Sequence, residues 1–393
     1  MQRTPLITHH QACGAKLVDF AGWEMPIQYS GVVDEYHTVR SHVGLFDVSH
    51  MGRVRIAGPG AVSFLQRVTT NDVGKLAVSQ AQYSMVCNEK GGIKDDIFVY
   101  RLASDEFLLC VNASNREKIL LWLQSQLAQD KTVRLEDRSF ELAQVAVQGQ
   151  KSRELVMSLG ATALEGLKLH HICDGMIGGL PCLLARTGYT GELGYEIYID
   201  SDKVGRLWDL LVDKGQAWGL KPAGLGARDL LRLEMGYLLY GNDMGEDTTP
   251  LEANADWTVS LQKGEFIGSQ ALLEQKQAGL ARRFVAFELV EKAVPRHGFR
   301  ILDPATLHPI GEVTSGNLSP LLQKGIGLGY VPMRYAEPDA SILIEIRNKS
   351  VPAIIVKPPF YRKPKSERLM ADSANKMPGN SSSPVPYAIS HKP

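Results

Sequence analysis

The hydrophobic periodicity of this chain changes near residue 283, and this change constrains the fold more than any other feature of the sequence. Beyond it, short strand-like apolar runs are separated by Pro, Gly and Asn, as is typical of a small β-barrel or jelly roll. The runs lie at 283–290, 298–302, 310–314, 325–331, 340–347 and 351–356. The glycine-rich segment 325–329 belongs to one of these strands, because no helix pattern follows it and its spacing is not that of a dinucleotide-binding loop.

Strand and helix signals alternate before that point. Val54 and Ile56 indicate a strand, and the apolar residues of 61–68 then follow the spacing of an amphipathic helix. Three further apolar runs, separated by turn-forming residues, lie at 81–87, 93–101 and 106–112. They predict a meander of hairpins, so we expect a helix packed on one face of a mostly antiparallel sheet.

A second unit of the same kind is predicted further along the chain. Its strand patterns lie at 143–149, 180–187 and 193–199. We expect its clearest helix to begin at Ser201 as the N-cap and to stop at Gly215. The side chains predicted to be buried on this helix are Val204, Leu207, Trp208, Leu211 and Val212.

The predicted fold class is therefore α+β, with two ferredoxin-like α+β units and a C-terminal, jelly-roll-like β-barrel. A chain of 393 residues is too long for one ordinary core, which agrees with several domains. We expect domains at 1–140, 141–278 and 279–363. The remaining residues, 364–393, are rich in Ser, Pro, Asn and Lys and have no apolar pattern, so they predict a disordered tail.

Charge and composition exclude several classes of protein. Lys plus Arg balance Asp plus Glu, 43 against 43, so no overall positive field attracts nucleic acid or anionic membranes. No apolar run approaches the roughly 20 residues that span a bilayer. The five cysteines form no CxxC pair, which disfavours disulfide scaffolds and zinc ribbons. We expect a cytoplasmic protein without nucleic-acid or membrane partners; a mitochondrial location would require removal of a presequence.

Familiar catalytic motifs are absent from the sequence: it contains no Walker A loop, HExxH helix, EF-hand loop or nucleophile elbow. The histidine doublets at 9–10 and 170–171 do not predict a metal site, because neighbouring residues on a strand point apart. We therefore expect no bound metal.

Two adjacent carboxylates, Asp95 and Asp96, begin a predicted strand. In an extended chain Asp96 shares its side with Phe98 and Tyr100, whereas Asp95 shares its side with Ile97. The pair fits a solvated hairpin end. It also fits a single carboxylate beside aromatic rings, where desolvation tunes its pKa and its charge stabilises a cationic centre.

Two glycine-rich segments are further candidates. Residues 187–196 place three glycines before an alternating strand, which fits an ordinary turn or a close approach of the backbone to a ligand. Residues 224–232 open a helix with Arg228 in the first turn, where a cation is unfavourable. An arginine there indicates an anionic or carbonyl-bearing partner.

Taken together, the motifs of this chain resemble those of the T-protein of the glycine cleavage system, an aminomethyltransferase. They lie at 19–26, 46–52, 88–96, 187–196, 224–232 and 313–320, in the family's order. The resemblance covers about residues 3 to 362. It implies three domains around a central folate cavity and tetrahydrofolate as co-substrate.

The resemblance also implies roles for individual residues. The catalytic carboxylate is Asp96, and Glu196 falls at the family's pterin-binding glutamate, where a carboxylate can accept hydrogen bonds from the pterin N–H edge. Arg228 and Arg362 match folate-contacting arginines. The positions that match residues of the cavity wall are Tyr83, Tyr100, Asn112 and Tyr189.

The implied reaction transfers a methylene carbon from the aminomethyl-lipoyl arm of the partner H-protein to tetrahydrofolate, with release of ammonia. Asp96 could take a proton or stabilise developing positive charge. Two alternatives share the fold. One is a folate-dependent demethylase of small methylated compounds. The other is a folate-binding iron–sulfur maintenance protein, which is disfavoured because Glu265 stands where that protein's signature has cysteine.

Overall fold

The computed structural model describes residues 1–127 and 131–362 and forms two compact units. The first unit comprises Met1–Arg232 and Leu238–Phe284, and the second, as far as it is described, comprises Leu233–Tyr237 and 285–362. The predicted domain limits stay predictions, and the predicted tail, 364–393, lies outside the described residues. Within the described part, no helix is long and apolar enough to cross a membrane.

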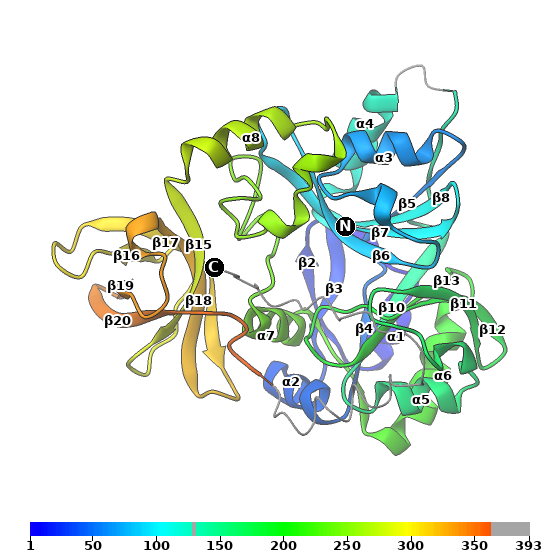
Figure 1. Cartoon of the computed structure of the whole chain (residues 1–393). Coiled ribbons are helices and arrows are strands. Elements are labelled where there is room, and N and C mark those ends of the chain that lie inside the picture. The colour runs from blue at the N-terminus through cyan, green and yellow to red at the C-terminus, as the bar shows by residue number, and fades with distance from the viewer. Residues whose placement is uncertain (128–130, 363–393) are drawn as a thin grey trace. The chain divides into compact units, whose positions relative to one another are not determined.

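A five-stranded antiparallel sheet lies in the first unit, with the strand order β6-β7-β8-β5-β9 (Figure 1). The strands are β5 (Gly52–Ala57), β6 (Ala81–Cys87), β7 (Ile93–Ala103), β8 (Glu106–Val111) and β9 (Arg134–Asp137). The helices α3 (Ala61–Val68) and α4 (Arg116–Leu127) cover one face, where Phe64 and Ile119 are buried with Val99. The predicted amphipathic helix and hairpin meander are therefore confirmed.

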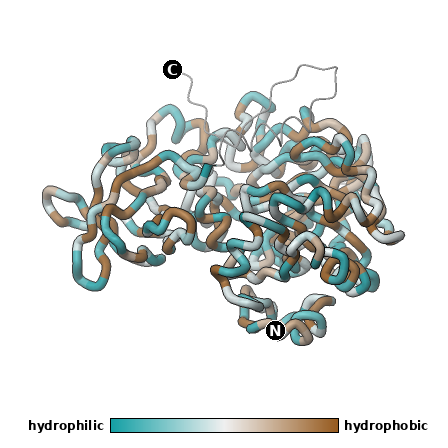
Figure 2. The backbone as a smooth tube through the Cα atoms, turned by 90° about the horizontal axis from the view of Figure 1, so that it is seen from below, coloured by the Kyte–Doolittle hydropathy of each residue, from teal (hydrophilic) through white to brown (hydrophobic). Residues whose placement is uncertain are grey.

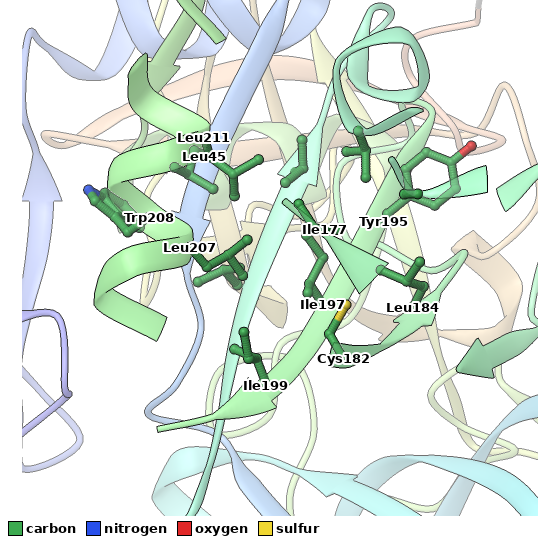
Figure 3. Packing of buried hydrophobic residues seen from close by; sticks show 14 of the residues in the cluster. Leu45, Ile177, Cys182, Leu184, Tyr195, Ile197, Ile199, Leu207, Trp208 and Leu211 are labelled. Carbon is green, nitrogen blue, oxygen red and sulfur yellow. The ribbon is translucent and has the colours of Figure 1, made fainter. Parts of the chain in front are cut away.

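A six-stranded sheet forms the second layer of this unit, with the strand order β11-β12-β13-β10-β4-β14. The strands are β4 (Val43–Asp47), β10 (Leu142–Gln148), β11 (Ile172–Ile177), β12 (Leu180–Ala185), β13 (Gly194–Asp200) and β14 (Leu220–Pro222). The helices α5 (Ser152–Ser158) and α6 (Val204–Gly215) pack on it. Figure 3 shows Leu207, Trp208 and Leu211 of α6 in the same core as Ile197 and Ile199 of β13.

The start of α6 differs from the prediction. The helix begins at Val204 with Lys203 as the N-cap, so Ser201 does not cap it. The Ser201 backbone N–H instead donates to the carbonyl of Glu141 at 2.8 Å, which extends the sheet beyond the end of β13. Gly215 ends the α-helix as predicted, before a single 3-10 turn.

The two sheets meet through the face of the first sheet that lies opposite α3 and α4 and the face of the second sheet that lies opposite α5 and α6. Tyr100, Leu108 and Cys110 of the first sheet form one buried cluster with Ala185 and Tyr198 of the second. Alternation along each strand separates the helix-facing residues from those that face the other sheet. The space between the sheets is therefore lined by side chains of β6, β7, β8, β10 and β13.

The other elements of the first unit were not predicted in detail. A small sheet has the order β1-β3-β2, with β1 at Gln2–Arg3, β2 at Lys16–Phe20 and β3 at Trp23–Gln28. The remaining helices are α1 (Ile7–Ala12), α2 (Val32–Ser41), α7 (Leu225–Met235) and α8 (Ser269–Ala278). His10 of α1 is a buried core histidine that hydrogen-bonds Asp47 at 2.9 Å.

The second unit contains a closed barrel with the strand order β15-β18-β17-β16-β19-β20. Its strands are β15 (Arg282–Leu289), β16 (Arg300–Leu302), β17 (Pro309–Ser319), β18 (Lys324–Pro332), β19 (Ser341–Ile346) and β20 (Lys349–Val356). Gly327 of β18 is required by packing, because a Cβ there would lie 2.3 Å from the Phe287 ring. The predicted barrel is confirmed. Figure 2 shows hydrophobic stretches along the chain trace between more hydrophilic turns.

Removing the Leu207 side chain should destabilise the first unit. Leu207 is fully buried between α6 and the second sheet, so Leu207→Ala leaves a cavity and should cost about 2–5 kcal/mol of unfolding free energy. Denaturant unfolding followed by tryptophan fluorescence measures the loss. The control Asp213→Ala, at an exposed position of the same helix, should stay within about 0.5 kcal/mol of wild type. Equal losses in the two variants would contradict the core assignment.

Candidate active site

A cavity of about 440 Å³ lies in the first unit. This volume falls in the range of small-molecule sites, about 300–1,000 Å³. Both sheets, α7 and the segment 238–242 contribute to its wall. The wall includes Phe20, Ile27, Val48, His50, Met51, Tyr83, Asp96, Phe98, Tyr100, Cys110, Asn112, Gln144, Tyr189, Glu196, Arg228, Asp229, Arg232, Leu238, Tyr240 and Asn242.

Asp96 places a carboxylate in this wall. It lies on β7 with Phe98 and Tyr100, and all three line the cavity, so the predicted strand face is confirmed. Tyr83 donates its hydroxyl proton to Asp96 Oδ2 at 2.8 Å, and Asn112 Nδ2 donates to Asp96 Oδ1 at 2.7 Å. Burial raises the pKa of Asp96, whereas these two hydrogen bonds lower it.

Asp95 points to the opposite side of β7 and is fully buried, so the solvated hairpin end is excluded. Its carboxylate accepts hydrogen bonds from Asn112 N, Asn112 Nδ2 and Asn115 Nδ2. Burial raises the pKa of Asp95, and the negative charge of Asp96 raises it further. The side-chain amide of Asn112 thus joins the two carboxylates, because Nδ2 donates to both.

Aromatic rings surround Asp96. Tyr83 stacks on Trp257 with ring centroids 5.6 Å apart, and Phe98 lies 5.8 Å from both Tyr83 and Tyr100. The negative faces of aromatic rings attract cations. A carboxylate among such rings therefore suits a positively charged reaction centre.

Glu196 lies on β13 and is 9% exposed. Thr187 donates its hydroxyl proton to Glu196 Oε2 at 2.5 Å, and Tyr100 donates to the same oxygen at 3.4 Å. The segment 187–196 thus brings a carboxylate and its hydrogen-bond donor together at the cavity. Glycines 188 and 194 make room for the Gln148 side chain, so the approach of the backbone to a ligand stays a prediction.

Arg228 and Tyr189 lie together in the same wall. The Arg228 guanidinium carbon is 4.8 Å from the centroid of the Tyr189 ring, and the Tyr189 hydroxyl donates to the carbonyl of Leu238. Among the described residues, no carboxylate forms an ion pair with Arg228. A partly buried guanidinium without such an ion pair can bind an anionic or carbonyl group of a ligand.

The structure therefore brings seven of the eight predicted site residues into one cavity: Asp96, Glu196, Arg228, Tyr83, Tyr100, Asn112 and Tyr189. Arg362 belongs to the second unit, where its side chain is exposed. Its predicted contact with folate stays a prediction. In the described ranges, no group of three His, Cys, Asp or Glu side chains is arranged to hold a metal ion.

Sequence reasoning missed several charged or titratable residues of the wall, among them Arg232 and His50. Arg232 of α7 forms ion pairs of 2.7 Å with both Asp229 and Asp243, which fix the segment that follows this helix. His50 is 2% exposed, and its Nδ1 has no hydrogen-bond partner in the described chain. Both residues lie inside the motifs at 224–232 and 46–52, but no local spacing distinguishes them from structural residues.

Asn254 stabilises a turn that precedes β15. Asn254 adopts a left-handed conformation with φ of 58°, which asparagine tolerates better than most residues. Its side-chain carbonyl accepts hydrogen bonds from Arg283 Nε at 3.1 Å and Nη2 at 2.6 Å. These bonds fix the turn that leads towards β15, and Asn254 is not among the residues that line the cavity.

An apolar cavity of this size with convergent carboxylates and a guanidinium defines an enzyme that acts on a small molecule. Two family models match the chain: the GCVT N-terminal domain at residues 6–263 and the glycine cleavage T-protein C-terminal barrel domain at residues 282–362. The chain therefore belongs to the glycine cleavage T-protein family.

Individual relatives agree with this assignment. Aminomethyltransferases of Halothermothrix orenii and Chloroherpeton thalassium are each 46% identical over 92% of this chain, and the matches cover 100% and 99% of those proteins. The crystal structure of glycine cleavage system aminomethyltransferase T from Bartonella henselae matches with a TM-score of 0.86 and 33% identity, over 92% of this chain and 98% of that one. The predicted enzyme class, aminomethyl transfer in glycine cleavage, is confirmed.

The neutral state of His50 should make stability depend on pH. Burial is the main cause that lowers the pKa of His50 to about 3; Asp47 opposes this effect, while Arg228 and Arg53 add to it. Between that value and the unfolded pKa of about 6.5, only the unfolded chain binds the proton, so folding stability falls as pH falls.

The His50→Gln variant isolates this effect from that of the carboxylates. From about pH 6 to pH 4, wild type should lose up to about 1.4 kcal/mol of unfolding free energy per pH unit more than the variant. Urea unfolding at several pH values measures the difference. Parallel pH profiles for the two proteins would show that folding does not lower the pKa of His50.

Proposed function

We propose that the cavity binds tetrahydrofolate as a co-substrate, and that the lipoyl arm of the glycine cleavage H-protein presents the aminomethyl group to it. This proposal rests on one observation: Asp96, Glu196 and Arg228 line the same cavity, and the size of this cavity suits a small molecule. Glu196 offers hydrogen-bond acceptors to the N–H edge of a ligand, and Arg228 offers a positive charge to an anionic or carbonyl group. Asp96 places a carboxylate beside aromatic rings.

Glu196 and Arg228 are proposed to hold the folate. A carboxylate can accept hydrogen bonds from the amino and ring N–H groups of a pterin, and such charge-assisted bonds are about twice as strong as neutral ones. Arg228 has no carboxylate partner in the described chain, so its charge is available to the ligand. Tyr83, Tyr100, Asn112 and Tyr189 complete the proposed contacts, and Arg362 is proposed to contribute from the second unit.

Asp96 is proposed as the catalytic carboxylate. In the overall reaction, the carbon leaves its sulfur and its amino nitrogen and bonds to two folate nitrogens. The two protons displaced from folate then balance the thiol and the ammonia. Asp96 can accept one of these protons, and its charge can stabilise the positive charge that develops on the carbon and nitrogen. Tyr83 and Asn112 hold the Asp96 carboxylate in place for either role.

We also propose a cytoplasmic location and the three-domain division with limits near residues 140 and 278. All five cysteines are free, which supports a reducing compartment. The change of periodicity near residue 283 supports the second limit.

An assay with aminomethyl-loaded H-protein and tetrahydrofolate tests the proposed reaction. Methylenetetrahydrofolate and ammonia should form in equal amounts and only when both substrates are present. Small methylated amines with tetrahydrofolate serve as the comparison, since they are the substrates of the alternative activity. Turnover of those amines, without turnover of loaded H-protein, would overturn the proposed substrate.

Asp96→Asn should lower kcat by a factor of about 100 or more, the scale on which general acid–base groups contribute. The amide keeps the shape and can still bond both Tyr83 and Asn112, so folate affinity and unfolding free energy should change little. Asp95→Asn is the matched comparison on the other face of β7. Its new amide would face three N–H donors, so it should reduce stability more than kcat. Greater loss of turnover in Asp95→Asn would show that the catalytic carboxylate is misassigned.

A further inference from the structure

The two carboxylate oxygens of Glu196 have different surroundings. Oε2 accepts the hydroxyl protons of Thr187 and Tyr100, at 2.5 Å and 3.4 Å. Among the described residues, none donates a hydrogen bond to Oε1. Because a carboxylate oxygen accepts about two hydrogen bonds, Oε2 is filled by the protein and Oε1 remains available at the cavity.

Thr187 is itself held in one place. It is 3% exposed, and its carbonyl accepts a hydrogen bond from Gln148 Nε2 at 3.2 Å. Glycines at 188 and 194 leave the space for this amide, since a Cβ at Gly188 would lie 2.1 Å from Gln148 Oε1. Threonine is also restricted at χ1 by its branched Cβ. The Thr187 hydroxyl is therefore aimed at Glu196 before any ligand binds.

A second chain of hydroxyls ends at the same oxygen. Tyr198 donates to the Tyr100 hydroxyl at 3.1 Å, and the rings of these two fully buried tyrosines pack edge to face. Because the Tyr100 oxygen accepts the proton of Tyr198, its own proton is directed to Glu196 and Thr187. Both donors to Glu196 thus lie on Oε2, from β7 and from the segment before β13.

We propose that Thr187 is a positioning residue for folate binding, which fixes Glu196 so that Oε1 faces the ligand. This inference rests on the proposed function, because it takes the N–H edge of a pterin as the group that Oε1 receives. Without the Thr187 hydroxyl, the Glu196 side chain can rotate and either oxygen can turn away from the cavity. Ligand binding must then also order the Glu196 side chain, an entropic cost that is absent when the free protein already holds this side chain in place.

Thr187→Val tests the inference, because it keeps the shape of the side chain and removes only the hydroxyl. The KM for tetrahydrofolate should rise about tenfold, as expected for the loss of one hydrogen bond to a charged group, while kcat at saturating folate stays within about twofold. Thr187→Ser restores the donor and should return the KM to within about threefold of wild type. Calorimetric titration with tetrahydrofolate gives the same comparison without turnover.

Thr190→Val is the matched control. Thr190 is fully buried in the same segment and donates to Gln148 Oε1 at 2.8 Å, and among the described residues no hydrogen bond joins it to Glu196. Because the variant acts on Gln148 and leaves both donors to Glu196 in place, it should reduce thermal stability as Thr187→Val does but raise the KM for folate by less than about twofold. Equal increases of KM in the two valine variants, or no recovery in Thr187→Ser, would assign Thr187 a purely structural role and overturn the inference.

The Glu196→Gln variant distinguishes failure of the inference about Thr187 from failure of the proposed function. If wild type binds tetrahydrofolate, Glu196→Gln weakens that binding and Thr187→Val does not, only the inference is wrong. If wild type does not bind tetrahydrofolate, or binds it equally well with Glu196→Gln, the proposed folate site is wrong and the inference falls with it.

Discussion

The face-to-face contact of the two sheets determines the arrangement of the rest of the first unit. Each sheet buries one face under helices. The other face of the first sheet meets the second sheet, whose corresponding face is also covered in part by α2 and α7. The two sheets contact each other directly at Tyr100 and Tyr198, whose ring centroids lie 5.6 Å apart. Beside this contact the sheets leave the cavity. The same alternation that fills the two cores therefore also selects which side chains reach the ligand space.

Burial of the carboxylates on β7 and β13 is possible because each one has its own donors. Asp95, on the helix-covered side of β7, and Asp96 and Glu196, in the cavity wall, all lie in a largely apolar interior, where a carboxylate costs free energy unless hydrogen bonds compensate. Asparagine amides bind Asp95, a tyrosine and an asparagine bind Asp96, and hydroxyls bind Glu196. None of these donors is a cation, so neither Asp96 nor Glu196, the two carboxylates that line the cavity, is paired with a lysine or arginine among the described residues.

The sequence predicted those features that depend on local periodicity. Alternation over 93–100 assigned Asp96 to the side of Phe98 and Tyr100, and the short runs after residue 283 indicated the barrel. It could not predict features that depend on distant pairing. The Ser201 side chain looked like a helix cap, but its backbone pairs with Glu141, sixty residues earlier in the chain. The burial of His50 and the convergence of Thr187 and Tyr100 on one oxygen likewise arise only when the two sheets meet.

The position of β4 has a consequence for the order of folding. This strand precedes the whole five-stranded sheet in the chain, yet it lies between β10 and β14 in the other sheet. During synthesis the strands within 52–137 can pair with one another as they emerge, because all their partners are close in sequence. The strand β4 cannot form its own pairs until residues 142–148, and then 220–222, have been synthesised. A ribosome that pauses before those residues leaves a completed first sheet beside an unpaired apolar strand, an intermediate that is exposed to aggregation or chaperone capture.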